Sequence, residues 1–314
     1  MGSSPEKAQT IVETRRGSGM LTLTTRATVG SVGRGMDDLE ARELAKRIVL
    51  RAGRLALARI DRPGYLKWKG HRDVVSEATL EVQESIVTAL QKECPGDGIL
   101  SEEGPEDEPL AVEAERLWIV DPICGSLNFA HGIPFFAVSI ALRVNGQLRV
   151  GVVHDPMRDE TYAARIGDQA TLNDRAINAR TVALGPEFWE QAMVGADLPP
   201  SGPRRKLALR AFDLVSDEVL AQNIMGSPAL GICYVAAGRL HAYWTFDAKP
   251  WDVAAACVIL AQAGGMVSDA DGGSWLHSDG SYVAANPASH PWALKSLKFV
   301  RDRDREVQQA AKTN

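Results

Sequence analysis

The sequence predicts an α/β protein in which layers of helix are stacked on mixed sheets. Two amphipathic helices come first, over residues 39–60 and 76–92. Long strands follow within 135–172, and helices alternate with strands from residue 204 onward. Antiparallel strands followed by interleaved helices and strands are typical of sheets that are covered by helices.

The first half of the chain supplies the early helices and the long strands. Apolar residues recur at helical spacing in the first helix, for example at Leu44, Ile48 and Ala52. The pair Asn145-Gly146 is a strong hairpin signal between two long strands. Strands are predicted at 98–101 and 117–120, on both sides of this turn within 135–153, and at 161–165 and 169–172.

The second half alternates between shorter helices and strands. Helices are predicted at 204–215, 228–237 and 252–263 and from residue 290, with strands at 221–225, 240–245, 266–268 and 281–284. Residues 1–35 lack an apolar period and are expected to form a disordered extension. The folded part is expected over 36–303, with halves of about 36–180 and 181–303, followed by a flexible tail at 304–314.

Composition excludes several functional classes. The chain has 314 residues and a net charge of −5, so no basic excess points to nucleic acid or to an anionic membrane surface. No stretch approaches the roughly 20 apolar residues of a membrane span. The four scattered cysteines form no metal-knuckle spacing and are expected to be free thiols in a reducing cytoplasm.

The most informative segment is 121–128, which reads Asp-Pro-Ile-Cys-Gly-Ser-Leu-Asn. It follows an apolar run, so we expect Asp121 at the end of a buried strand. Gly125 and Ser126 then offer backbone N–H groups where a helix begins, which suits an anion. A carboxylate beside such a turn can hold a metal ion against a phosphate.

Other acidic residues fit this interpretation, although each also has a structural explanation. Glu102 and Glu103 follow the predicted strand at 98–101, where they could equally form a solvated loop. Asp252 opens a predicted helix, where it could simply be an N-cap. Asn128, just after the anion turn, is expected to fix the following loop.

Two longer motifs resemble the signatures of the inositol monophosphatase family of magnesium-dependent, lithium-sensitive phosphatases. Trp118 to Phe129 reads Trp-Ile-Val-Asp-Pro-Ile-Cys-Gly-Ser-Leu-Asn-Phe, followed by His131-Gly and Pro134-Phe135. Trp251-Asp252-Val-Ala-Ala leads to Ala263-Gly-Gly. The resemblance implies a layered α-β-α-β-α sandwich of the sugar-phosphatase type with mixed sheets, usually in a homodimer, with the metal- and phosphate-binding residues mainly in the half at 36–180.

The resemblance also implies roles for individual residues. Glu102, Asp121 and the Ile123 carbonyl would hold the ion that activates a water, and Asp121 and Asp252 would hold a second ion. Ser126 would orient the water, and the N–H groups of Gly125 and Ser126 would bind the phosphate. The implied cofactor is Mg²⁺, with Mn²⁺ and Zn²⁺ as alternatives that Cys124 introduces.

Cys124 is the first departure from the family pattern, because it stands where the family has a second-ion carboxylate. A thiol is a poor ligand for Mg²⁺. One interpretation is a small, half-buried residue beside a weak or absent second ion. The others are a ligand for a softer metal and a low-pKa thiolate nucleophile.

Two further departures affect the base and the substrate. Lys69 and the run from Asp73 to Glu77 fit the family's early motif, but Thr79 occupies the position of an aspartate that helps to activate the water. Thr245, seven residues before Asp252, replaces a glutamate that grips a substrate hydroxyl. Asp247 could offer a different substrate contact.

The sequence therefore predicts a cytoplasmic, homodimeric, metal-dependent hydrolase of a small phosphate monoester that is inositol-, sugar- or nucleotide-like. Activity is expected to be weakened, because Cys124 and Thr79 replace family carboxylates. Two alternatives stay open. One is non-hydrolytic chemistry on a phosphorylated substrate, such as leaving-group elimination or cyclisation. The other is an inactive protein that binds a phosphorylated ligand.

Overall fold

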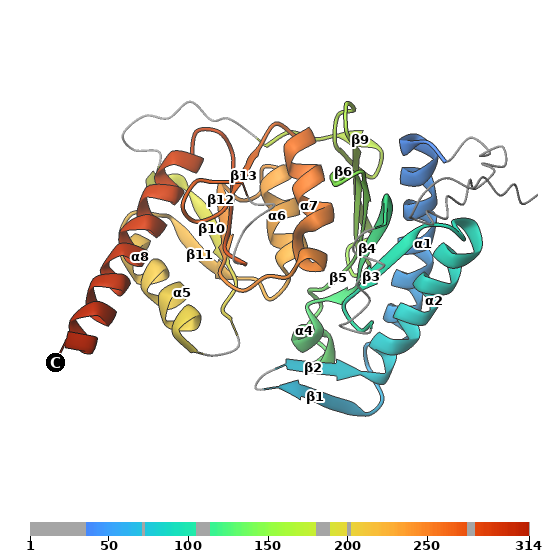
Figure 1. The fold of residues 1–314 in the computed structure, drawn as a ribbon, viewed down its shortest axis with the longest axis horizontal. Helices are drawn as coiled ribbons and strands as arrows, with labels where there is room; N and C mark the ends of the chain where they lie inside the picture. Colours follow the sequence, from blue (N-terminus) through green and yellow to red (C-terminus); the bar gives the residue numbers. More distant parts are fainter. Residues whose placement is uncertain are drawn as a thin grey trace, which may run out of the picture. The chain divides into compact units, whose positions relative to one another are not determined.

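Helices and sheets alternate in the order α-β-α-β-α (Figure 1). The computed structural model describes residues 36–70, 73–104, 114–179, 189–199, 202–274 and 280–313. The predicted extension at 1–35 lies outside these residues. The layered fold that the resemblance implied is therefore confirmed.

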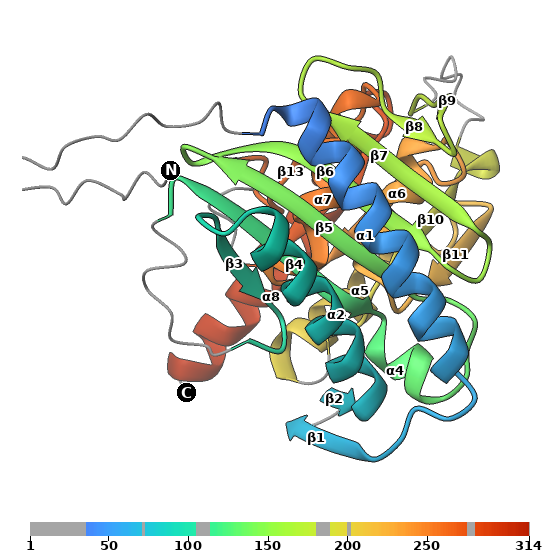
Figure 2. The same cartoon turned by 90° about the vertical axis from the view of Figure 1, so that its right-hand side faces the viewer.

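The first layer consists of α1 (Asp38–Arg59) and α2 (Glu77–Glu93). Asp37 caps α1 by accepting hydrogen bonds from the N–H groups of Leu39 and Glu40. The buried stripes of both helices pack against the first sheet (Figure 2). The amphipathic pattern of the sequence thus places an apolar core between this layer and the sheet.

The first sheet has seven strands in the order β3-β4-β5-β6-β7-β8-β9. β3 is parallel to β4, and the other neighbours are antiparallel. Asn145 and Gly146 join β5 to β6 with φ values of 50° and 77°, as a tight hairpin requires. The strands are β3 (Gly98–Ser101), β4 (Arg116–Cys124), β5 (Ala137–Val144), β6 (Gln147–Asp155), β7 (Glu160–Arg165), β8 (Thr171–Leu172) and β9 (Arg175–Ala176).

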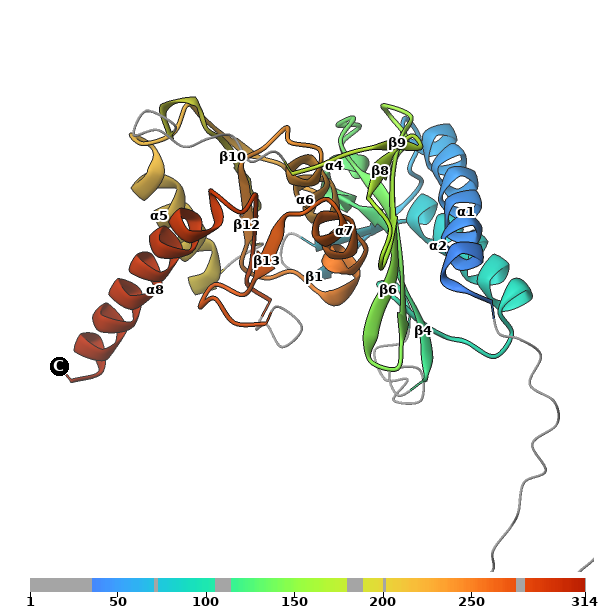
Figure 3. The same cartoon turned by 90° about the horizontal axis from the view of Figure 1, so that it is seen from above.

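The middle layer is formed by α6 (Pro228–Ala236) and α7 (Pro250–Gln262), which lie between the two sheets (Figure 3). Both helices are apolar almost all round, because a sheet covers each side. Gly151 in β6 lets α7 approach closely, since a Cβ there would overlap the backbone of Ala255. The position of α7 matters because this helix carries Asp252.

The second sheet has five strands in the order β11-β10-β12-β14-β13. β10 is parallel to β11 and β12, whereas β14 is antiparallel to β12 and β13. The outer layer, α5 (Gly202–Val215) and α8 (His290–Thr313), encloses a separate apolar core against this sheet. The strands are β10 (Met193–Ala196), β11 (Ala221–Ile224), β12 (Ala242–Thr245), β13 (Met266–Ser268) and β14 (Tyr282–Ala285), and a short 3-10 helix spans Trp189–Gln191.

Several elements differ from the sequence prediction. The hairpin of β1 (Leu66–Gly70) and β2 (Asp73–Ser76) was not predicted, and neither was β10. Helix α8 runs on to Thr313, through most of the segment expected to be a tail. Within the described residues, no helix is long and apolar enough to cross a membrane.

Candidate active site

The candidate site begins at the end of β4. The strand does not stop at Asp121 as predicted but continues to Cys124, with an irregularity in its pairing to β5 between these residues. Asp121 is 1% exposed, and its Oδ1 accepts the N–H of Ile123 at 3.1 Å. Its Oδ2 is buried and has no hydrogen-bond partner among the described residues. An orphaned carboxylate oxygen of this kind is suited to a cation.

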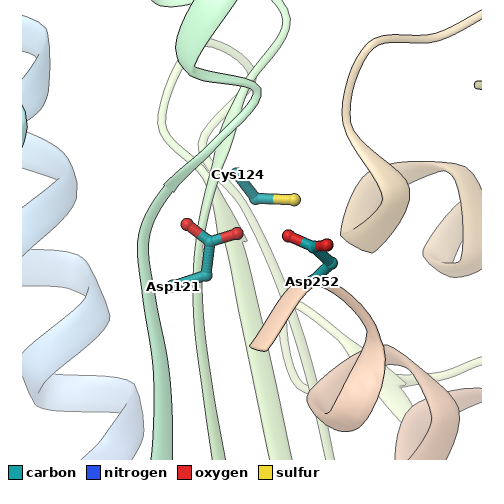
Figure 4. Close-up of side chains that lie close together, drawn as sticks. All are labelled: Asp121, Cys124 and Asp252. Atoms are coloured by element: carbon teal, nitrogen blue, oxygen red, sulfur yellow. The ribbon is translucent and has the colours of Figure 1, made fainter. Parts of the chain in front are cut away.

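Three side chains converge at this point. One ligand atom from each of Asp121, Cys124 and Asp252 lies within 4.8 Å of the other two. A carboxylate oxygen of Asp121 faces the Cys124 sulfur and the Asp252 carboxylate (Figure 4). Cys124 is buried rather than half-buried, at 2% exposure, and its Sγ accepts the Ala229 N–H at 3.4 Å.

Asp252 reaches the cluster from the first turn of α7. The helix starts at Pro250 and its N-cap is Lys249, so the N-cap interpretation of Asp252 is wrong. The Asp252 carboxylate nevertheless accepts the Lys249 N–H at 2.6 Å, which orients it at the helix start. The two parts of the site therefore come from different layers of the fold.

The cluster concentrates negative charge away from water. Burial, and then the charges of Glu102 and Asp252, raise the pKa of Asp121 well above its usual range. Burial and Glu102 likewise raise the pKa of Asp252 to about 7. Burial and the two aspartates raise the pKa of Cys124. A divalent cation would remove this repulsion, so these residues suit a bound divalent metal ion.

Glu102 follows β3, and its charge acts on both aspartates. Lys69 of β1 donates to Glu102 at 2.9 Å and to Glu103 at 2.8 Å. Partial burial lowers the pKa of Lys69, but the two glutamates outweigh it and the net shift is upward. Gln83 of α2 accepts hydrogen bonds from the Ser101 hydroxyl and from the Glu103 N–H, which fixes the loop after β3.

At the segment predicted to bind an anion, the backbone turns sharply and a short helix begins. Gly125 has φ 110°, and Ser126 begins the short helix α4 (Ser126–Ala130). A Cβ at Gly125 would lie 2.9 Å from the Gly226 carbonyl oxygen, so this position requires glycine. Asn128 fixes the turn as predicted, because its Nδ2 donates to the carbonyls of Phe135 at 2.8 Å and Met225 at 3.1 Å.

The threonines at the other two departures, Thr79 and Thr245, are both buried. Thr79 is buried in the first turn of α2, and its Oγ1 lies 2.8 Å from Ser76 Oγ. Thr245 ends β12 and is 4% exposed. Asp247 is exposed and lies 3.6 Å from Arg204.

Asp197 was not predicted from the sequence. This buried carboxylate follows β10, accepts the Gly226 N–H and the Tyr243 hydroxyl, and contributes to the raised pKa of Asp252 after burial and Glu102. It therefore links the second sheet to the turn before α6. The only sequence signal was the short apolar run Met193–Ala196 that ends in an acid.

The α-β-α-β-α fold and the buried carboxylate cluster beside a glycine turn are the features that the sequence motifs predicted for a phosphatase of the inositol monophosphatase type. The inositol monophosphatase family model matches residues 38–302. This chain belongs to the inositol monophosphatase family, as its sequence motifs indicated.

Individual relatives agree with this assignment. An inositol-1-monophosphatase from Mesorhizobium japonicum is 38% identical over 231 residues, which cover 73% of this chain and 85% of that protein. A Nus factor SuhB from Pseudomonas aeruginosa is 35% identical over 77% of this chain and 90% of its own length. Among solved structures, the extragenic suppressor protein SuhB from Bartonella henselae matches with a TM-score of 0.75 and 32% identity, covering 82% of this chain and 98% of that chain.

Proposed function

We propose that this protein hydrolyses a small phosphate monoester, inositol-, sugar- or nucleotide-like, with the help of divalent metal ions. The observation that carries the proposal is the convergence of Asp121, Cys124 and Asp252, with Glu102 acting on both aspartates, at the start of the Gly125 turn. Family membership supplies the reaction class. Mg²⁺ is the proposed ion, with Mn²⁺ or Zn²⁺ as alternatives.

Two sets of residues would hold the metal. Glu102, Asp121 and the Ile123 carbonyl suit one ion, while Asp121 and Asp252, with Cys124 beside them, suit a second. When bound, such ions activate a water and offset charge on the attacking and leaving oxygens. The Ile123 N–H keeps Asp121 in place, and the Lys249 N–H does the same for Asp252.

The remaining residues act on the phosphate and the water. The N–H groups of Gly125 and Ser126 stand at the start of α4, where backbone donors lack helical partners and can bind phosphate oxygens. The Ser126 hydroxyl orients the water. Thr79 cannot accept a proton as an aspartate would, and its hydroxyl already interacts with Ser76. Hydrolysis is therefore expected to be slow.

The candidate substrate-binding residues, Thr245 and Asp247, lie at and just after the end of β12 in the second sheet. Thr245 is too short to reproduce a glutamate contact to a ring hydroxyl, so inositol phosphate is a weaker candidate than other phosphate esters. Asp247 is the alternative contact, for which it would have to exchange its interaction with Arg204. We also propose a cytoplasmic homodimer, by analogy with the family.

Phosphate release tests this function. Inositol, sugar and nucleoside monophosphates are incubated with the protein and Mg²⁺, Mn²⁺ or Zn²⁺, with Asp121→Asn as the matched inactive variant. We expect metal-dependent release by the wild type on at least one substrate and none by the variant. Release that is equal in the two proteins, or that persists in excess chelator, would contradict the proposal.

A second candidate is non-hydrolytic chemistry on a phosphorylated substrate, such as elimination or cyclisation. The engagement of Thr79 with Ser76, where the family places a water-activating aspartate, favours it. Reaction in isotopically labelled water separates the two. Hydrolysis places solvent oxygen in the released phosphate, whereas elimination or cyclisation leaves all product oxygens from the substrate.

A third candidate is a binding role without turnover. Several relatives carry the name Nus factor SuhB, which is not the name of a phosphatase. Tight binding of a phosphate ester, with no product formed under any metal, would support this role over both reactions.

A further inference from the structure

Cys124 changes the chemistry of the metal site. We infer that the cluster of Asp121, Cys124 and Asp252 selects a thiophilic divalent cation of the Zn²⁺ and Cd²⁺ type over Mg²⁺, with Cys124 Sγ as a ligand. The inference rests on the proposed function only in taking this cluster as the metal site. It goes further by naming the class of metal ion and the ligand atom, Cys124 Sγ, that determines the preference for this class.

The donor set supports a soft or borderline ion. Mg²⁺ requires oxygen ligands in nearly octahedral geometry, whereas Zn²⁺ accepts sulfur and carboxylate oxygen in a four-coordinate site. Catalytic zinc sites have three protein ligands and one open position, and this cluster offers three ligand atoms within 4.8 Å of one another. Tetrahedral ligands around Zn²⁺ are about 3.5 Å apart, a spacing that lies within this 4.8 Å limit.

A buried polar atom at the site independently indicates a ligand. Asp121 Oδ2 is buried without a hydrogen-bond partner among the described residues, and a carboxylate oxygen of Asp121 faces the sulfur (Figure 4). An oxygen with no geometric hydrogen-bond partner among the described residues is available as a ligand for an ion at this position.

The sulfur is held in place for metal binding. Ala229 N–H donates to Sγ at 3.4 Å, a contact that stabilises a metal-bound thiolate and fixes the side chain. Binding replaces the S–H bond by a sulfur–metal bond and releases the thiol proton to solvent, so no oxidant or reductant is required.

The other cysteines provide a matched control. Cys257 of α7 is also 2% exposed and belongs to the same apolar core as Cys124, but it is not one of the three clustered ligands, and burial alone accounts for the upward shift of its pKa. Cys257→Ala therefore removes a buried thiol without touching the cluster. Cys124→Ala removes the proposed ligand.

The test is a Cd²⁺ titration followed by the sulfur-to-metal charge-transfer absorption in the ultraviolet. We expect one band per chain in the wild type and in Cys257→Ala, and no band in Cys124→Ala. Competition calorimetry should show that Zn²⁺ affinity falls by at least about 100-fold in Cys124→Ala, while Mg²⁺ affinity changes by less than about 3-fold. In Cys124→Asp the preference should move toward Mg²⁺, which tests the inference even if the alanine variant fails to fold.

The outcomes separate this inference from the proposed function. Absence of the band in the wild type, or an unchanged band in Cys124→Ala, overturns the thiophilic site even if Mg²⁺-dependent phosphate release is found. A band that depends on Cys124, in a protein that releases no phosphate, supports the thiophilic site and refutes the hydrolase.

Discussion

Asp121 and Asp155 are two buried carboxylates on the first sheet with opposite surroundings. They lie on β4 and β6, which flank β5, and Asp155 ends its strand. Asp155 is fully buried, accepts the N–H groups of Met157 and Arg158, and pairs with the Arg158 guanidinium at 2.9 Å. Asp121 accepts a single N–H and keeps one oxygen unpaired among the described residues.

The electrostatics of the two positions follow from these partners. Burial raises the pKa of both carboxylates, but Arg158 opposes the shift at Asp155. At Asp121 the nearby Glu102 and Asp252 add to it. Asp155 thus stabilises the loop after β6, whereas we propose that a bound cation balances Asp121. The comparison predicts a structural role for Asp155 and a metal-binding role for Asp121 without reference to any relative.

Asparagine substitutions should separate the two positions most strongly. In Asp121→Asn, phosphate release is expected to fall by at least about 1,000-fold, because the residue that both ion sites share loses its charge. In Asp155→Asn, activity at temperatures where the protein is folded should stay within about 3-fold, but the free energy of unfolding should drop by about 1–3 kcal/mol. Steady-state assays and denaturant unfolding measure both effects. Similar losses of activity in the two variants would remove the distinction.

The loop that carries Glu102 should show a smaller, indirect effect. In Gln83→Ala, the Ser101 hydroxyl and the Glu103 N–H lose their acceptor, so metal affinity and phosphate release should fall by about 10- to 100-fold. Gln262→Ala is the matched control, because Gln262 also accepts a backbone N–H, from Gly167 at 3.0 Å, outside the site. If excess metal does not restore part of the rate in Gln83→Ala, Gln83 does not act through the Glu102 loop.

Placing carboxylates at positions 124 and 79, where the family has them, should raise the rate of phosphate release. We expect Cys124→Asp combined with Thr79→Asp to raise Mg²⁺-dependent phosphate release by at least about 10-fold, since an ion ligand and a base are both regained. The single variants show which residue dominates. A double variant that is folded yet inert on every substrate would contradict the assignment of these positions.

Histidines outside the site should produce the smallest effect, on stability. Burial lowers the pKa values of His154 and His290, whose ring nitrogens lie 3.0 Å from the Thr161 hydroxyl and 2.9 Å from the Ser268 hydroxyl, respectively. Below pH 6.5 the unfolded chain therefore binds more protons than the folded protein. The free energy of unfolding should decrease as the pH is lowered, by at most about 1.4 kcal/mol per pH unit for each histidine. Unfolding as a function of pH measures this slope.

Variants test the origin of the slope. His154→Gln should flatten it, whereas His131→Gln, at an exposed position, should leave it unchanged. A slope that is identical in all three proteins would place the acid sensitivity elsewhere.

Much of the fold could be predicted because local patterns and tertiary structure agree. The Asn145-Gly146 turn, the strand over Gly98–Ser101 and the early helices are found at or within a few residues of their predicted positions. The β1–β2 hairpin was missed although Leu66-Lys67-Trp68-Lys69 alternates apolar and polar residues, because the run is short and its apolar side chains, Leu66 and Trp68, are exposed. The end of α8 was missed because its polar, charged sequence has the composition of a tail although its backbone is helical.

The site was predictable only in part, for physical reasons. Asp121 and Asp252 lie within signatures, and the structure brings them together with Cys124. A motif singled out Lys69, but no local spacing encodes its contacts with Glu102 and Glu103 or those of Gln83 with the loop after β3. Asp197 follows a strand too short to be recognised from alternation. The roles of Thr79 and Thr245 are predictions that the proposed variants and substrate panel address.

The central claim is that the Asp121 cluster requires a cation, and thermal unfolding with and without metal tests it most directly. Without divalent ions, Asp121→Asn should unfold at a temperature roughly 2–4 °C above the wild type, because a repelled buried charge is gone. A divalent ion at 100 times its dissociation constant should then stabilise the wild type by about 2.7 kcal/mol and the variant far less. A wild type that is the more stable protein without metal, and that gains nothing from Mg²⁺ or Zn²⁺, would contradict the account.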